Sequence, residues 1–283
     1  MVDLILHIPH SSLHIPFMDG FVENEELIRQ EMVKLTDWCT DLLFFSKDDI
    51  MLLPDYSRLF CDVERFADDC QEVMAQSGMG VLYEKTDKGE LLRTITPELR
   101  EKIMRFYYRK HHANFTEAVK NQLEQHYQAV IIDCHSFSDV PFERDLNKDP
   151  NRPDINIGTD PFHTPGNLLQ LTREYFESAG YSVGINWPYA GTIVPESFYL
   201  KEKRVHSIMI EVNRKLYLNE TSDDPGENYY ITEMAIRKYL RMVKENYGFI
   251  EKEEPVMAEN EDEEKNLNHL IPYPLKRRRQ KKA

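Results

Sequence analysis

Two histidines that lie far apart in the chain each stand at the end of a short apolar run. His10 follows LILHIP, and His135 closes AVIIDCH. Such runs predict buried strands, and the carboxyl ends of parallel strands meet at one edge of a sheet, where open α/β folds bind their ligands. Two imidazoles at that edge, together with a nearby carboxylate, would supply the ligands of a catalytic zinc ion.

The spacing alone does not place the third ligand. An HxxE arrangement would put a glutamate at position 13, where the chain has Leu13. Asp37, in the run LTDWCTD, is the first choice, and Asp41 and Asp133 are the alternatives. We therefore predict one zinc ion that is held by Asp37 and the two histidines and that keeps an open position for water.

A glutamate lies in the last strongly apolar run. Glu211 belongs to IEVNR at 210–214, and its apolar neighbours indicate that it either points into a cleft or pairs with a buried arginine. A carboxylate beside a metal-bound water can act as a general base and then protonate a leaving nitrogen. If Glu211 faces the histidines, the pattern predicts hydrolysis of an amide.

Three arginines near these runs are candidates for binding the carboxylates of a substrate. Arg58 and Arg65 bracket the run SRLFCDVERF, and Arg214 follows the candidate base. A guanidinium group binds a carboxylate through two parallel hydrogen bonds, so these side chains suit a dicarboxylate. Taken singly, each is more often an ion-pair partner, here of Asp62 or Glu64.

Other features give weaker indications of function. His112 lies on a predicted long helix and is either a substrate ligand or an ordinary surface residue. Gly191 and Thr192 belong to PYAGT, a turn that could bring backbone N–H groups to a substrate. The sequence has no GxSxG elbow, no Walker A loop and no GxGxxG after a strand, which argues against a serine hydrolase, a kinase and a dehydrogenase.

Runs rich in Val and Ile alternate with amphipathic stretches, which predicts a single α/β domain with a mixed, mostly parallel sheet flanked by helices. The expected helices lie at about 23–46, 96–126, 165–179 and 227–247, and Thr96 before Pro97 marks the start of the second. The expected strands are Val2 to Ile8, Ile50 to Leu53, Leu59 to Val63, Ala129 to Cys134, Ile155 to Ile157, Ser182 to Ile185 and Ser207 to Val212.

The composition fits a globular protein with a charged tail. The chain has 283 residues, 41% of them hydrophobic, and a formal net charge of −14, which disfavours nucleic acid and membrane partners. No segment approaches the roughly 20 apolar residues that span a bilayer, so we expect a cytoplasmic protein. We assign residues 1–250 to the catalytic domain and 251–283 to a tail, acidic and then basic, that is either mobile or a binding segment. The oligomeric state is left open.

The order of these runs resembles the N-formylglutamate amidohydrolase family. The matching runs, between about residues 4 and 218, are HIPHSSLHIP, LTDWCTDLL, SRLFCDVERF, LRTITPELREKIMRFYYRKHH, DCHSFS, INIGTD and EVNRKLYL. The resemblance implies a fold related to the zinc carboxypeptidases and aspartoacylases. It also implies zinc-dependent hydrolysis of N-formyl-L-glutamate to formate and L-glutamate in histidine breakdown.

By the same resemblance, the metal ligands are His10, Asp37 and His135, the catalytic residue is Glu211, and Arg65 binds the substrate carboxylate. The chain departs from the family pattern at a few positions, which are Glu64 for asparagine, Lys110 and His111 for Pro-Tyr, and Ala190 for a second glycine. These departures leave open a hydrolase of another N-acyl amino acid or small peptide. A third possibility is a binding protein that keeps the fold without catalysis.

Overall fold

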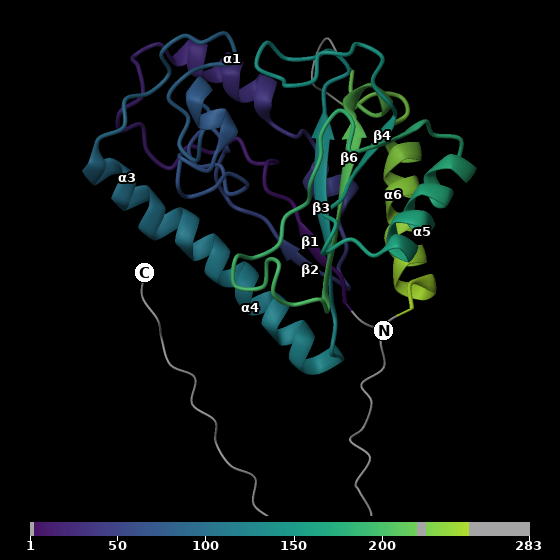
Figure 1. Ribbon diagram of the computed structural model, residues 1–283. Helices are drawn as coiled ribbons and strands as arrows, with labels where there is room; N and C mark the ends of the chain where they lie inside the picture. Colours follow the sequence, from purple (N-terminus) through teal and green to yellow (C-terminus); the bar gives the residue numbers. More distant parts are fainter. Residues whose placement is uncertain (1–2, 220–224, 249–283) are drawn as a thin grey trace, which may run out of the picture. The chain divides into compact units, whose positions relative to one another are not determined.

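A six-stranded sheet forms the centre of the protein in this computed structural model, which describes residues 3–219 and 225–248 (Figure 1). The predicted charged tail lies outside the described residues. The strand order is β2-β1-β3-β6-β4-β5. Four strands are parallel, namely β1 (Ile5–His7), β2 (Ile50–Leu52), β3 (Ala129–Phe137) and β6 (Val205–Asn213). The remaining pair, β4 (Ile155–Gly158) and β5 (Val183–Ile185), runs antiparallel to β6. The predicted α/β class with a mixed, mostly parallel sheet is therefore confirmed.

One predicted strand is wrong. The segment from Leu59 to Val63 forms turns and has no strand pairing. Within it, the Asp62 carboxylate accepts a hydrogen bond from the amide of Glu64 at 3.0 Å, and the Asp62 carbonyl accepts one from the amide of Arg65 at 3.3 Å. Local bonds of this kind compete with a strand. The apolar run correctly predicted burial, since its apolar side chains are all buried, but not the conformation.

The predicted helix at 23–46 is two helices, α1 (Glu25–Leu35) and α2 (Thr40–Leu43), with Asp37 in the break between them. The chain becomes extended at Thr36, which has a ψ of 136°. The Asp37 amide then donates a hydrogen bond of 2.9 Å to the carbonyl oxygen of His10. This bond ties the break to the chain just after β1, so a ligand candidate lies where the sequence predicted helix interior.

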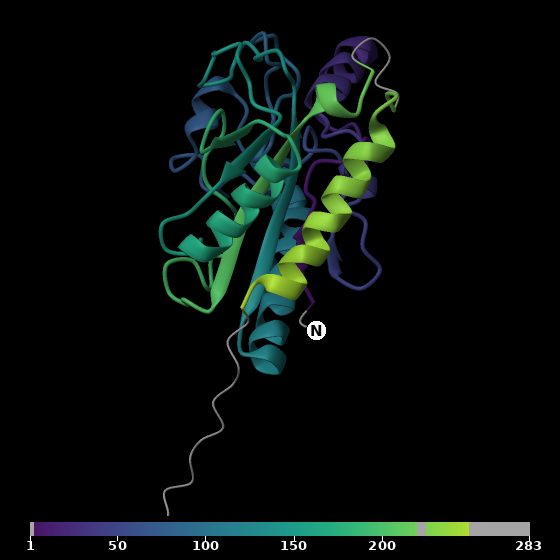
Figure 2. The ribbon, with the colours of Figure 1, turned by 90° about the vertical axis from the view of Figure 1, so that its right-hand side faces the viewer.

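Helices cover both faces of the sheet (Figures 1 and 2). On one face lie α5 (Gly166–Ser178) and α6 (Tyr229–Asn246), and on the other lies α4 (Arg109–His126). Helix α3 (Pro97–Ile103) precedes α4, and the Thr96 side chain caps it by accepting a hydrogen bond from the Leu99 amide, as predicted. Among the described residues, no helix is long and apolar enough to cross a membrane.

A wide turn joins α3 to α4. Residues Met104–Tyr108 form the π-helical element η2, in which the amide of Arg109 donates to the carbonyl oxygen of Met104, five residues earlier. A π turn accommodates one residue more than the α-helix on either side of it. The predicted helix at 96–126 therefore exists, but the side chains after Tyr108 face directions that uninterrupted α-helical spacing would not give.

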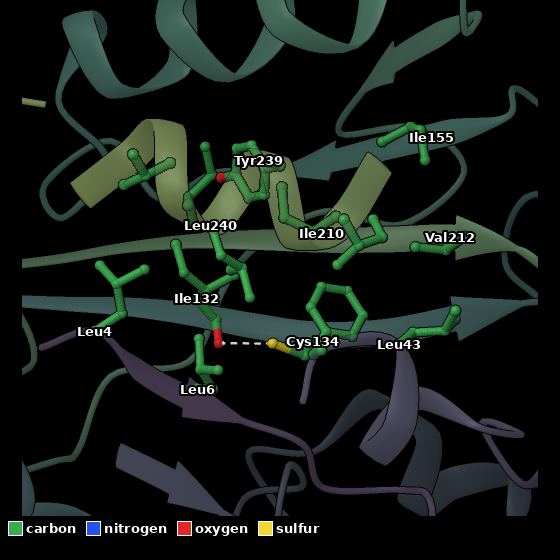
Figure 3. Close-up of a cluster of buried hydrophobic side chains, with 14 of the residues drawn as sticks. Leu4, Leu6, Leu43, Ile132, Cys134, Ile155, Ile210, Val212, Tyr239 and Leu240 are labelled. Carbon is green, nitrogen blue, oxygen red and sulfur yellow. Dashed lines mark hydrogen bonds between the residues drawn. The ribbon is translucent and has the colours of Figure 1, made fainter. Parts of the chain in front are cut away.

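Two apolar layers lie on opposite faces of the sheet. One, under α5 and α6, contains Leu6, Ile132 and Ile210 (Figure 3). The other, under α4, contains Ile5 and Ile131. Because successive strand side chains point to opposite faces, residues two or four positions after Ile5 and Ile131 also face α4. The polar carboxyl ends of β1 and β3 therefore project to the α4 side.

Candidate active site

Three residues that the sequence indicated as metal ligands lie together. His135 is on β3, His10 follows β1, and Asp37 occupies the break between α1 and α2. Asp37 Oδ2 is 3.1 Å from Nδ1 of His135 and 3.5 Å from Nδ1 of His10. All three side chains are buried, and their potential ligand atoms lie within 4.8 Å of one another. The group could hold a metal ion.

The surroundings of His10 leave one ring nitrogen free for such an ion. Its Nε2 lies 2.8 Å from Oδ1 of the buried Asp62, so Nε2 carries the proton and donates it to that carboxylate. Nδ1 then presents its lone pair toward Asp37. It is buried and has no hydrogen-bond partner among the described residues. A carboxylate behind an imidazole is the usual support of a metal-binding histidine.

His135 has the same kind of support. Its Nε2 lies 3.1 Å from Oδ1 of Asp133 and 3.1 Å from Oε2 of Glu64, while its Nδ1 faces Asp37. Although burial alone would raise it, the two neighbouring imidazoles hold the pKa of Asp37 well below its usual range. Two imidazole nitrogens and one carboxylate oxygen form a donor set that fits zinc.

Glu211 is the direct neighbour of His135 across the sheet. The two residues are partners in the register of β3 and β6, so both side chains project to the same face. Glu211 is buried, and its Oε2 has no hydrogen-bond partner within the described part of the chain. Burial, together with the negative charges of Asp37 and Glu64, raises the pKa of Glu211 to about 8. A carboxyl group in this setting can exchange a proton near neutral pH.

All three predicted substrate arginines pair with aspartates, and two of them do so through hydrogen bonds. Arg58 Nη2 donates to Asp62 at 3.0 Å, and Arg214 Nη2 donates to Asp37 at 3.1 Å. Arg65 Nε lies 3.7 Å from Asp62 Oδ2, and it is buried without a hydrogen-bond partner in the described chain. The ion-pair alternative therefore describes all three arginines, and Nε of Arg65 is the one pairing atom that makes no hydrogen bond among the described residues.

His112 and the turn at Gly191 contact the site indirectly. His112 Nε2 donates to the carbonyl oxygen of Val63 at 3.0 Å, which joins α4 to the chain that carries Glu64 and Arg65. Burial lowers the pKa of His112 to about 4, so the ring is neutral at pH 7. Gly191 has a φ of +95°, and two residues later the Ile193 amide donates to Asp133 Oδ2 at 3.1 Å. These contacts join both residues to the chains that carry Glu64 and Asp133.

Sequence reasoning gave no role to two other members of the site, His7 and Tyr83. His7 Nδ1 lies 3.1 Å from Oδ1 of Asp133, its register partner on β3. The sequence could have indicated His7, because this residue is on the strand that leads to His10 and faces the same side as Ile5. The hydroxyl of Tyr83 donates to Asp62 Oδ2 at 2.8 Å, and nothing in the local sequence pattern indicates this contact.

A family model matches most of the chain. The model of the N-formylglutamate amidohydrolase family matches residues 2–218, and the chain belongs to this family. Membership of this family supports a hydrolase role.

Two solved structures share the fold. The crystal structure of N-formylglutamate amidohydrolase from Ralstonia eutropha JMP134 is similar with a TM-score of 0.75 and 21% sequence identity, over 86% of this chain and 93% of that one. A gene product of Agrobacterium tumefaciens has a TM-score of 0.58 and 18% identity, over 86% of this chain and 90% of that one. No protein with a curated description matches the sequence.

Proposed function

We propose that this chain is a zinc-dependent amidohydrolase that converts N-formyl-L-glutamate and water to formate and L-glutamate. One observation carries the proposal: two imidazole Nδ1 atoms and the Asp37 carboxylate converge in a buried group directly beside Glu211. The family match supports the reaction, and the fold is shared with the Ralstonia amidohydrolase.

The metal would be held by His10, Asp37 and His135. When bound, a zinc ion lowers the pKa of a water molecule and polarises a carbonyl oxygen. The protein's own contribution is orientation: Asp62 fixes the ring of His10 from behind, and Asp133 does the same for His135. Supporting contacts of this kind typically change metal affinity or activity by about 10- to 100-fold.

Glu211 would move the proton that amide hydrolysis requires. It takes a proton from the attacking water, whose oxygen bonds to the acyl carbon, and returns that proton to the leaving nitrogen as the C–N bond breaks. A pKa of about 8 suits a group that both accepts and donates a proton near pH 7. The burial of Glu211 keeps bulk water from competing for the proton.

Arg65 would bind a substrate carboxylate through its guanidinium group, which pairs with Asp62 at 3.7 Å without a hydrogen bond among the described residues. The pairing of Arg58 with Asp62 and of Arg214 with Asp37 favours a second candidate, a hydrolase of N-acyl amino acids that carry a single carboxylate. Comparing kcat/KM for N-formyl-L-glutamate with N-formyl-L-methionine and N-acetyl-L-glutamate separates the two. A preference for N-formyl-L-methionine would establish the second candidate and refute the first.

The mechanism is tested with Glu211→Gln. We expect kcat to fall by about 10²- to 10⁴-fold, the usual contribution of a positioned acid or base, while the zinc content stays unchanged. Glu31→Gln is a matched control, since Glu31 is also buried and its carboxylate accepts a hydrogen bond from the Asp87 amide far along the chain.

Three results would contradict the proposal. Unchanged turnover in Glu211→Gln would show that Glu211 is not the general base. A purified protein that contains no zinc, and gains no activity when zinc is added, would show that the chain does not catalyse a zinc-dependent reaction. Bound zinc without turnover of any of the three substrates would instead favour a non-catalytic binding protein.

A further inference from the structure

A second group of potential metal ligands lies on the other side of the His135 ring. His7, Glu64 and Asp133 each offer one ligand atom, and these atoms lie within 4.8 Å of one another. His7 Nδ1 is 3.1 Å from Asp133 Oδ1 and 3.3 Å from Glu64 Oε1. The three residues come from β1, β3 and the chain between β2 and α3, so separate elements converge here as they do at the first group.

The two carboxylates of this group lack a permanently charged partner. Within the described chain, the ion pairs of Glu64 and Asp133 involve the rings of His7 and His135 and no arginine or lysine. A bound cation would place a permanent positive charge beside these two carboxylates, which are unfavourable in a buried site without one.

One carboxylate oxygen of this group makes no hydrogen bond within the described chain. Glu64 Oε1 is buried and has no hydrogen-bond partner among the described residues, although it faces His7. The Glu64 side chain is 15% exposed, whereas His7 is fully buried, so Glu64 gives this group its access to solvent.

The far side of His7 is also arranged as a metal-binding histidine requires. His7 Nε2 lies 2.9 Å from Nε2 of His111. With Nε2 directed at His111, Nδ1 is the ring nitrogen of His7 that faces Asp133 and Glu64.

We propose that His7 Nδ1, Glu64 Oε1 and Asp133 Oδ1 bind a second divalent cation of the zinc and cobalt class. One nitrogen and two carboxylate oxygens are ligands that such ions accept. The imidazole of His135 lies between the two sites, with Nδ1 toward the first and Nε2 toward the second. The inference rests on the proposed function only in assigning Nδ1 of His135 to the first ion.

Metal content tests the second site. The full chain is stripped with a chelator, dialysed against zinc and assayed for zinc per protein. We expect two equivalents in the wild type, one in Glu64→Gln, which keeps the shape of the side chain, and two in the control Glu31→Gln. His7→Gln should also hold one equivalent. Because it alters a different ligand, the test does not depend on the correct folding of one variant. His10→Gln, which removes a ligand of the first site, should hold one.

Cobalt gives an independent readout. Titration with Co²⁺ should change the visible absorption spectrum in two stages for the wild type and in one stage for Glu64→Gln. One equivalent in both the wild type and Glu64→Gln, lost in His10→Gln, would overturn the second site and keep the first. No bound metal in the wild type would overturn both. Two equivalents retained in both Glu64→Gln and His7→Gln would also refute the assignment.

Discussion

The two halves of the site are positioned by different forces. His135 and Glu211 lie side by side on β3 and β6, where the ladder of backbone hydrogen bonds and two apolar layers fix them. Asp62, Glu64 and Arg65 lie instead in residues 54–95, a segment whose described helices and strands amount to the short η1 (Val73–Ser77). There the charged groups hold one another and the histidines. The sheet half depends on register, and the 54–95 segment depends on electrostatic pairing.

Asp62→Asn should have the largest effect, because it removes a charge on which the 54–95 segment depends. Asp62 is fully buried and contacts His10, Arg58 and the hydroxyl of Tyr83. Removing one partner of a buried ion pair destabilises a protein by about 3–5 kcal/mol. We also expect about 10- to 100-fold weaker zinc binding. Urea unfolding and competition with a zinc chelator measure the two effects.

The exposed Asp55 in the same segment is the matched control, and Asp55→Asn should change stability by less than about 0.5 kcal/mol. An Asp62→Asn protein as stable as the wild type would show that apolar packing alone holds the segment.

His112→Gln should change how stability depends on pH. An unfolded histidine has a pKa of about 6.5, and burial lowers that of folded His112 to about 4. Between these values the unfolded chain binds more protons than the folded chain. The contribution of neutral His112 to the free energy of unfolding is therefore fully present above pH 6.5 and is lost as the pH falls toward 4. The loss amounts to roughly 3 kcal/mol. Urea unfolding at pH 7 and pH 4 should show a smaller acid loss in the variant; equal losses would refute this role.

Arg65→Lys should have a smaller effect that is confined to substrate binding. The charge remains, but the forked donor geometry is lost. We expect KM for N-formyl-L-glutamate to rise about tenfold, equivalent to about 1.4 kcal/mol, with little change in kcat. Steady-state kinetics measures both quantities. An unchanged KM would remove Arg65 from the substrate site.

Thr96→Ala should have the smallest effect, and it gives a reference for the loss of stability without a change at the charged groups. Thr96 caps α3 through the Leu99 amide, and loss of such a cap typically costs about 1 kcal/mol. Zinc content and kcat should equal those of the wild type. A loss of zinc would mean that the position of the helix, and not only the ion pairs, sets the geometry of the 54–95 segment.

The sequence predicted the sheet half of the site well because its signals are local. The apolar runs that end at His10, His135 and Glu211 indicate strands, and the carboxyl ends of parallel strands meet at one edge. The same rule could not place Asp37, because Asp37 lies in a break of the predicted helix, where its amide bonds the distant His10 carbonyl oxygen.

The 54–95 segment was predicted poorly for a physical reason. The run SRLFCDVERF buries its apolar side chains whether it is a strand or a series of turns, so periodicity could not distinguish the two. What decides between them is the Asp62 carboxylate, which binds both His10, 52 residues earlier, and Tyr83, 21 residues later. Contacts between residues so far apart in the chain cannot be predicted from the spacing of residues within one short run.

The π turn at Met104–Tyr108 sets the rotational phase of everything that follows it on α4. Each α-helical residue advances the side chain by about 100° around the axis, so one residue fewer in this turn would rotate His112 away from Val63 by that angle. The same rotation would carry His111 away from His7. The length of this short segment is therefore as much a determinant of the site as the identities of the two histidines beyond it.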